Sequence, residues 1–191
     1  SRAITIKGAD ASDGLTITNG TSQTLTIEKG AAPNVQVFKE WVSLGPNKTF
    51  EYLDDGVSYR VKVTNTDGHN TVSNSVTVTT DKLVATLGEI TSTTRAITIK
   101  GADASNGLTI TNGTSQTLTI EKGASDNPTI YKSWTSLGPD KTYSSLVHNT
   151  DFRVKVTNTD GYNTVSDSQT VSTKRLTGGS APACSAIVTD S

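Results

Sequence analysis

The sequence is poor in the features that staple a chain together or anchor it in a membrane. It has one cysteine, Cys184, so no disulfide can form within the chain and the fold must rest on its hydrophobic core. Two roles stay open for this thiol, a small apolar space-filler or one half of a disulfide between subunits. No apolar run is long enough to form a transmembrane helix, so membrane insertion is not expected.

Charge and helical periodicity are also scarce. Charged residues make up 18% of the 191 residues and the formal net charge is -1, which argues against nucleic acid or an anionic membrane as an obligate partner. No window of ten or more residues repeats its apolar positions with the period of an amphipathic helix. Threonine, a β-branched residue that suits either face of a strand, is the commonest residue.

The chain contains an internal repeat. Arg2–Ala31 recurs as Arg95–Ala124 with one change, Asp13 becoming Asn106. The offset of 93 residues then continues without a gap through the rest of the first copy. A repeat of this length predicts two domains of similar fold, each large enough to bury a modest core.

Short runs in each copy alternate apolar and polar residues with period 2, which is typical of half-buried strands. Leu25–Glu28 and Tyr59–Thr64 are clear examples. Asp-Gly and Asn-Gly pairs separate the runs, and each pair provides a residue that adopts the positive φ of a tight turn. The pattern predicts an all-β protein with seven or eight strands in each repeat.

The second copy predicts the full set of strands. They are expected at Leu87–Thr91, Ala96–Lys100, Leu108–Thr111, Thr117–Glu121, Thr129–Trp134, Thr142–Leu146, Phe152–Asn158 and Thr164–Thr173. Asp81–Gly88 is expected to join the copies as a segment too short for a flexible tether. The predicted domains are therefore 1–82, without a first strand, and 83–174, followed by a linker and a last strand at 175–191.

The second half of each copy carries a recognisable order of features. A leucine precedes a turn in Lys48–Leu53, an aromatic residue opens Tyr59–Asn65, and the turn at Asp67-Gly68 leads to Ser73–Thr80. This order resembles the last three strands of a fibronectin type III or related immunoglobulin-like module. The resemblance implies two tandem immunoglobulin-like β-sandwiches of the kind that serve as spacer or adhesive modules in microbial surface proteins, and it implies no catalysis.

No group of residues predicts catalysis or a bound cofactor. His69 and His148 have no counterpart in the other copy, and no His, Cys and Asp spacing resembles a metal cage. Asp54 and Asp55 fit either a turn or a calcium site, but Asp54 aligns with Val147 in the second copy. We therefore expect no enzyme activity, no cofactor and no metal.

Several residues recur in both copies, and each set leaves two interpretations open. Trp41 and Trp134 fit core anchors or a solvent-facing platform for carbohydrate rings. Lys, Glu and Asn recur on strands as charges that are solvated or as partners in an isopeptide crosslink. The recurring pairs are Lys7/Lys100, Glu28/Glu121 and Asn65/Asn158.

The end of the chain resembles the strand that its beginning lacks. Ser185–Ser191, followed notionally by Ser1 and Arg2, aligns without a gap with the segment from Leu87 to Arg95. In this alignment Val188 falls on Ile90 and is expected to enter a groove beside Ile4 and Ile6. Ala186, Ile187 and Thr189 complete the expected strand.

Three explanations fit this match. The tail of one subunit completes the first domain of the next, the chain is a segment of a longer array, or the tail folds back onto its own first domain. The first explanation predicts a structural subunit of an extracellular or cell-surface filament that assembles head to tail with itself by strand addition. The alternative is an adhesin or carbohydrate-binding segment of a long surface protein, whose partners are glycans or proteins.

Overall fold

The computed structural model describes residues 2–8, 15, 17, 19–30, 34–42, 47–101, 106–123 and 127–178. The predicted tail strand and Cys184 lie outside these ranges. Every regular element in the described part of the chain is a β-strand, which confirms the all-β prediction. No helix there is long and apolar enough to cross a membrane.

The chain divides into two compact units. The first comprises residues 1–84 with the segments 111–115 and 158–165, and the second comprises residues 85–110, 116–157 and 166–191. Strands β1 to β6 form the first sandwich, and strands β8, β9 and β11 to β15 form the second.

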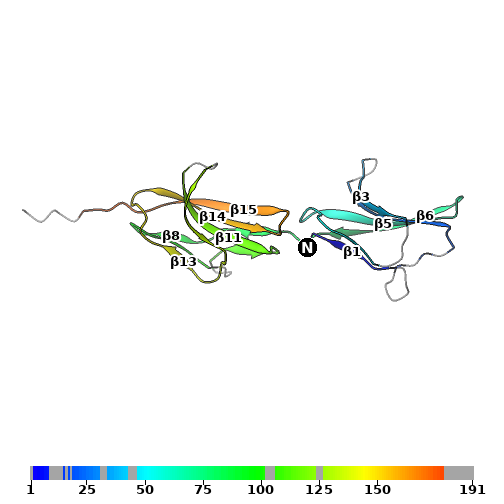
Figure 1. Cartoon of the computed structure of the whole chain (residues 1–191), viewed down its shortest axis with the longest axis horizontal. Helices are drawn as coiled ribbons and strands as arrows, with labels where there is room; N and C mark the ends of the chain where they lie inside the picture. Colours follow the sequence, from blue (N-terminus) through cyan, green and yellow to red (C-terminus); the bar gives the residue numbers. More distant parts are fainter. Residues whose placement is uncertain are drawn as a thin grey trace, which may run out of the picture. The chain divides into compact units, whose positions relative to one another are not determined.

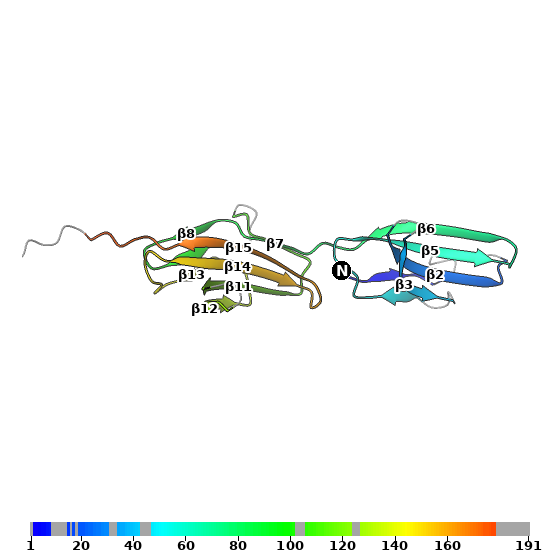
Figure 2. The same ribbon diagram turned by 90° about the horizontal axis from the view of Figure 1, so that it is seen from above.

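The first sandwich has a two-stranded layer and a four-stranded layer. The small layer pairs β1 (Ile4–Ile6) with β4 (Lys48–Phe50). The large layer has the order β3 (Gln36–Trp41), β2 (Ser22–Lys29), β5 (Ser58–Thr66) and β6 (Thr71–Thr79). Figure 1 shows β1 in a separate layer from β5 and β6, and Figure 2 shows the large layer with its four strands side by side.

The second sandwich repeats this plan with one more strand in the small layer. That layer has the order β13 (Lys141–Tyr143), β9 (Ile97–Ile99) and β8 (Ile90–Ser92). The large layer has the order β12 (Thr129–Trp134), β11 (Ser115–Lys122), β14 (Asp151–Thr159) and β15 (Thr164–Ser172). A further short pair joins β7 (Val84–Thr86) to β10 (Thr109–Thr111).

The alternating sequence places apolar side chains on the inner faces. In β14, Phe152, Val154 and Val156 are buried and their neighbours are more exposed. Aromatic pairs close the same part of each core, because Phe38 meets Tyr59 and Tyr131 meets Phe152 edge to face with ring centroids 5.3 Å apart.

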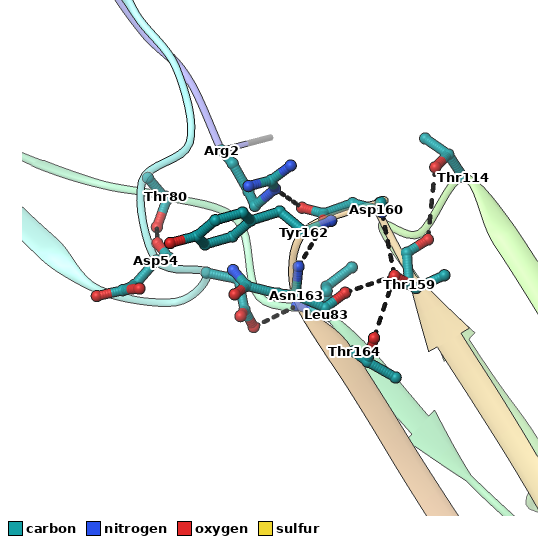
Figure 3. A network of polar contacts seen from close by, with 12 residues as sticks. Arg2, Asp54, Thr80, Leu83, Thr114, Thr159, Asp160, Tyr162, Asn163 and Thr164 are labelled. Atoms are coloured by element: carbon teal, nitrogen blue, oxygen red, sulfur yellow. Dashed lines mark hydrogen bonds and ion pairs between the residues drawn. The ribbon is translucent and has the colours of Figure 1, made fainter.

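The hairpin turns have the chemistry that their sequence predicts. In the β14–β15 turn, Oδ1 of Asp160 accepts hydrogen bonds from the backbone N–H groups of Tyr162 and Asn163, and Gly161 has a φ of 93° (Figure 3). The β5–β6 turn repeats these bonds, with Asp67 as the acceptor. The N–H groups of Asn70 and His69 lower the pKa of Asp67 because they favour its charged form.

The segment between the repeats is more than the joining segment predicted from the sequence. It contains β7, and Leu83, Ala85 and Leu87 within it are buried. The predicted strand Leu87–Thr91 is also shifted, because β8 begins at Ile90. The three buried residues alternate with period 2, so this signal was present in the sequence.

Neither tryptophan is a fully buried core residue. Trp41 packs partly buried against the core of the first sandwich, on the edge strand β3. Trp134 is half-buried on the equivalent edge strand β12. Lys39 and Lys132 lie over the two rings, with Nζ 5.9 and 5.8 Å from the centroids. Trp41 therefore borders the core of the first sandwich, Trp134 is half-buried on the matching strand, and a lysine side chain lies over each ring.

Candidate strand-acceptor groove

The small layer of the first sandwich has an open edge. In the second sandwich β9 lies between β13 and β8, and Ile90, Thr91 and Ser92 pair with Ile99, Thr98 and Ile97. In the first sandwich β1 pairs with β4, and no strand of the described residues lies on its other side. Within the described part of the chain, the N–H and C=O groups along that side of β1 have no strand partner, which is the arrangement that strand addition uses.

An apolar groove of about 320 Å³ lies beside this edge. Strands β1, β2, β5 and β6 all contribute to its walls. The lining residues are Ile4, Thr5, Ile6, Lys7, Leu15, Leu25, Val61, Val63, Asn74, Ser75, Val76 and Val78. The structure thus brings together two of the predicted assembly residues, Ile4 and Ile6, at one opening.

Side chains that line the groove of the first sandwich are less buried than the equivalent side chains of the second sandwich. Val154 and Val156 are fully buried and Ile99 is 1% exposed, whereas their counterparts in the first sandwich are all half-buried. The matched pairs are Ile6/Ile99, Val61/Val154 and Val63/Val156. Because these residues are identical in each pair, the exposure follows from what covers them.

The cover in the second sandwich is the segment that begins at Leu87. The Leu87 side chain is 5% exposed, whereas Ile90 is only half-buried. The backbone N–H of Leu87 donates to Oδ2 of Asp167 at 2.7 Å, and Nε2 of Gln169 donates to the Leu87 carbonyl at 3.2 Å. Leu87 is therefore the main anchor of this segment, whereas the sequence had pointed to Ile90.

Each sandwich also has a buried glutamate that pairs with an arginine, at a position whose role the sequence did not decide. Glu121 is buried on β11, where Nε and Nη2 of Arg153 donate to its Oε2 at 2.8 and 2.5 Å and the Thr119 hydroxyl donates to its Oε1 at 2.9 Å. Glu28 has the same partners in Arg60 and Thr26. Each glutamate is thus held by a charge pair within its own sheet.

These pairs leave no isopeptide arrangement among the recurring residues of the second sandwich. Lys100 Nζ lies 3.3 Å from Asp140, and Glu121 is engaged by Arg153. The Asn158 carboxamide donates to the carbonyl groups of Val84 and Thr111 at 3.0 and 2.9 Å. Asn158 therefore ties β7 to β10 through their backbones.

The buried Glu121 predicts a pH dependence of stability. Burial is the largest influence and would raise its pKa, but the hydrogen bonds from Arg153 and Thr119 and the charges of Arg153 and Lys155 outweigh it and hold the pKa below 4.5. Because the folded pKa is depressed, the stabilisation is present above pH 4.5 and is lost as the pH falls through the folded pKa.

Glu121→Gln should therefore destabilise the second sandwich at pH 7 by about 1.5–3 kcal/mol, the range for hydrogen bonds to charged groups. The gap between the two unfolding curves should narrow as the pH falls from 5 to 2, measured by urea titration at each pH. A gap of constant size over this range would contradict the assignment.

The described residues hold no cluster of three or more His, Cys, Asp or Glu side chains that could bind a metal ion. The aspartates considered for calcium have other partners. Asp54 pairs with Lys29 at 2.7 Å, and Oδ2 of Asp55 accepts from the Leu83 N–H at 3.2 Å. Figure 3 shows Asp54, whose backbone carbonyl accepts a hydrogen bond from the Thr80 hydroxyl.

No family model and no curated protein matches the chain. Solved structures that resemble it include a two-domain fibronectin type III segment of chicken tenascin, 14% identical, with a TM-score of 0.36 over 82% of this chain and 87% of the segment. The FN1–FN3 segment of chicken CNTN1 is 9% identical, with a TM-score of 0.35 over 91% of this chain and 63% of the segment. Likeness at this level carries no argument about function, so the two-layer sandwich fold rests on the strand order and register described above.

Proposed function

We propose that this chain is a structural subunit of an extracellular filament, in which the groove of the first sandwich accepts a β-strand from the tail of a second copy. The observation that carries the proposal is the open edge of β1 above an apolar groove. In the second sandwich, the equivalent place is covered by the segment that begins at Leu87. An exposed strand edge beside an apolar groove is the usual acceptor in strand addition.

The pairing follows from the register of β8 on β9. Transferred to the first sandwich, it places Val188 opposite Ile6, Thr189 opposite Thr5 and Asp190 opposite Ile4. Ala186 takes the place of Gly88, where a Cβ would lie 1.7 Å from the carbonyl oxygen of Asn106 in the second sandwich. The residue of the first sandwich that matches Asn106 is Asp13, which lies outside the described residues. We place the paired strand at Ile187–Asp190, because in the second sandwich their counterparts are Glu89, which accepts from the Lys100 N–H, and β8, which pairs with β9.

The affinity of such a strand is modest. Val188 stands where Ile90 is half-buried, so it gains less than the 1.5–3 kcal/mol of a fully buried side chain. Ser185 stands in the place of the anchor Leu87 and contributes no apolar surface. A donor and an acceptor on the same chain nevertheless form a head-to-tail contact that need not close on itself, and such contacts extend into filaments.

The proposal predicts that one charge in the tail abolishes assembly. Val188→Glu changes a residue of the tail and, in the proposed pairing, places a charge in the apolar groove, where an unpaired charge is costly. Sedimentation velocity and negative-stain microscopy of the full chain should show filaments for the parent protein and monomers for this variant. Ile6→Glu should have the same effect from the acceptor side.

Two matched controls accompany these variants. Thr177→Glu adds the same charge to an exposed residue ahead of the paired strand, and Thr49→Glu adds it to an exposed residue of β4 that does not line the groove, so both should still assemble. A parent chain that stays monomeric over the whole concentration range overturns the proposal and favours a segment of a longer array or an adhesive module. Assembly by Val188→Glu at the parent level also overturns it.

A further inference from the structure

In the second sandwich, two side chains of β15 hold the covering segment by its backbone. Asp167 provides only an acceptor and takes the Leu87 N–H, while Gln169 provides the donor for the Leu87 carbonyl. The backbone N–H and C=O of Leu87 are therefore hydrogen-bonded by two neighbouring side chains on the same face of one strand. This pair fixes which residue of the covering segment lies beside β15.

The first sandwich has different residues at both positions. Asn74 replaces Asp167 and Val76 replaces Gln169. Both are exposed, Val76 by 60%, and both line the groove. In the β5–β6 pair, Asn74 lies opposite Val63 and Val76 opposite Val61, so both stand beside the half-buried valines of the groove.

The two replacements compensate each other chemically. A valine cannot donate a hydrogen bond, so the function of Gln169 is lost at Val76. An asparagine side chain carries a carbonyl acceptor and two N–H donors in one planar group, whereas an ionised aspartate only accepts. Asn74 can therefore pair with both the N–H and the C=O of one strand residue, and Val76 then adds apolar cover where Gln169 was polar.

We infer that Asn74 is the positioning residue of the acceptor groove, which fixes the register of the added strand by pairing with the backbone N–H and C=O of Ser185 from a second copy. The inference rests on the proposed strand addition and names the contact that sets its register. Ser185 is the tail residue that aligns with Leu87, whose backbone the second sandwich holds at the equivalent place. The bond is made to the backbone, so it tolerates serine in place of leucine.

The test uses the full chain and a fluorescent synthetic peptide of residues 180–191, in which Ser185 is internal. Anisotropy gives the dissociation constant at a chain concentration below that of assembly. Asn74→Leu, which keeps the size of the side chain and removes both polar groups, should weaken binding about tenfold, the effect of two ordinary hydrogen bonds. Asn74→Asp retains the acceptor alone and should weaken it about threefold.

Two further arms make the assignment specific. The double variant Asn74→Asp with Val76→Gln rebuilds the pair of the second sandwich and should bind within about twofold of the parent. A peptide N-methylated at Ser185 loses the donated hydrogen, so it should bind the parent about threefold to tenfold more weakly and bind Asn74→Leu no more weakly than the plain peptide does. The thermal midpoint of each variant controls for folding.

The outcomes separate the inference from the proposed function. If N-methylation weakens binding by the same factor for the parent and for Asn74→Leu, the Ser185 backbone does not pair with Asn74 and the inference is wrong while strand addition stands. If the plain peptide does not bind the parent chain at all, strand addition by the tail and the role of Asn74 are both wrong.

Discussion

A chain in which residues 87–94 are copied in place of Ser1 is expected to have a first sandwich that unfolds about 10 °C higher. The copied segment supplies the strand that covers the second sandwich, in the register that the repeat defines. Burying its leucine alone contributes about 1.5–3 kcal/mol, and covering Ile6, Val61 and Val63 adds apolar area that offsets the cost of ordering the strand. A gain of about 2 kcal/mol corresponds to roughly 10 °C for a domain of this size.

Differential scanning calorimetry can follow this change, because the transition of the second sandwich serves as an internal standard. A control chain carries the same segment with aspartate in place of its leucine, which should return the first transition close to the parent value. The covered groove should also stop binding the peptide of residues 180–191. An unchanged first transition would show that the groove does not accept this strand, whatever its shape.

Much of the fold follows from patterns that can be read in the sequence. The alternating run that contains Val154 and Val156 predicts a strand with one buried face, and β14 has that pattern of burial. The Asp-Gly turns were predictable for the same reason, since only a few residues tolerate a positive φ there. The repeat also allowed each site to be compared with its copy, which is how the open edge of β1 was expected.

The anchor of the covering segment could not be read in the same way. Leu87 lies between β7 and β8 in an irregular stretch, so its burial depends on tertiary contacts with Asp167 and Gln169 on β15. Local alternation favoured Ile90, which lies in the regular strand and is only half-buried. Strand patterns indicate which residues share a face but not how closely a second element approaches that face.

The buried glutamates illustrate a second limit. Glu121 alternates with Thr119 on β11, a pattern that normally indicates a solvated face. Its burial requires Arg153 on the neighbouring strand to fold over it, and that contact depends on a cross-strand register that the sequence does not specify. The sequence therefore favoured a simple surface charge over isopeptide chemistry, and neither interpretation included the arginine partner.

The tail itself offers the largest expected gain in assembly. Ser185→Leu restores the anchor that Leu87 provides in the second sandwich, and Ala186→Gly matches Gly88, the residue at the equivalent position of the covering segment. A buried leucine side chain is worth about 1.5–3 kcal/mol, so the double variant should assemble at a concentration about 10–150-fold lower than the parent. Sedimentation velocity across a dilution series measures this threshold.

Ser180→Leu adds the same apolar surface to the tail outside the paired strand and separates anchoring from non-specific association. If Ser180→Leu lowers the threshold as far as the double variant does, the groove does not bind an apolar side chain at residue 185 and the register transferred from β8 is wrong. If only the double variant lowers the assembly threshold, the first sandwich binds its added strand as the second sandwich binds Leu87, through one aliphatic side chain and the backbone beside it.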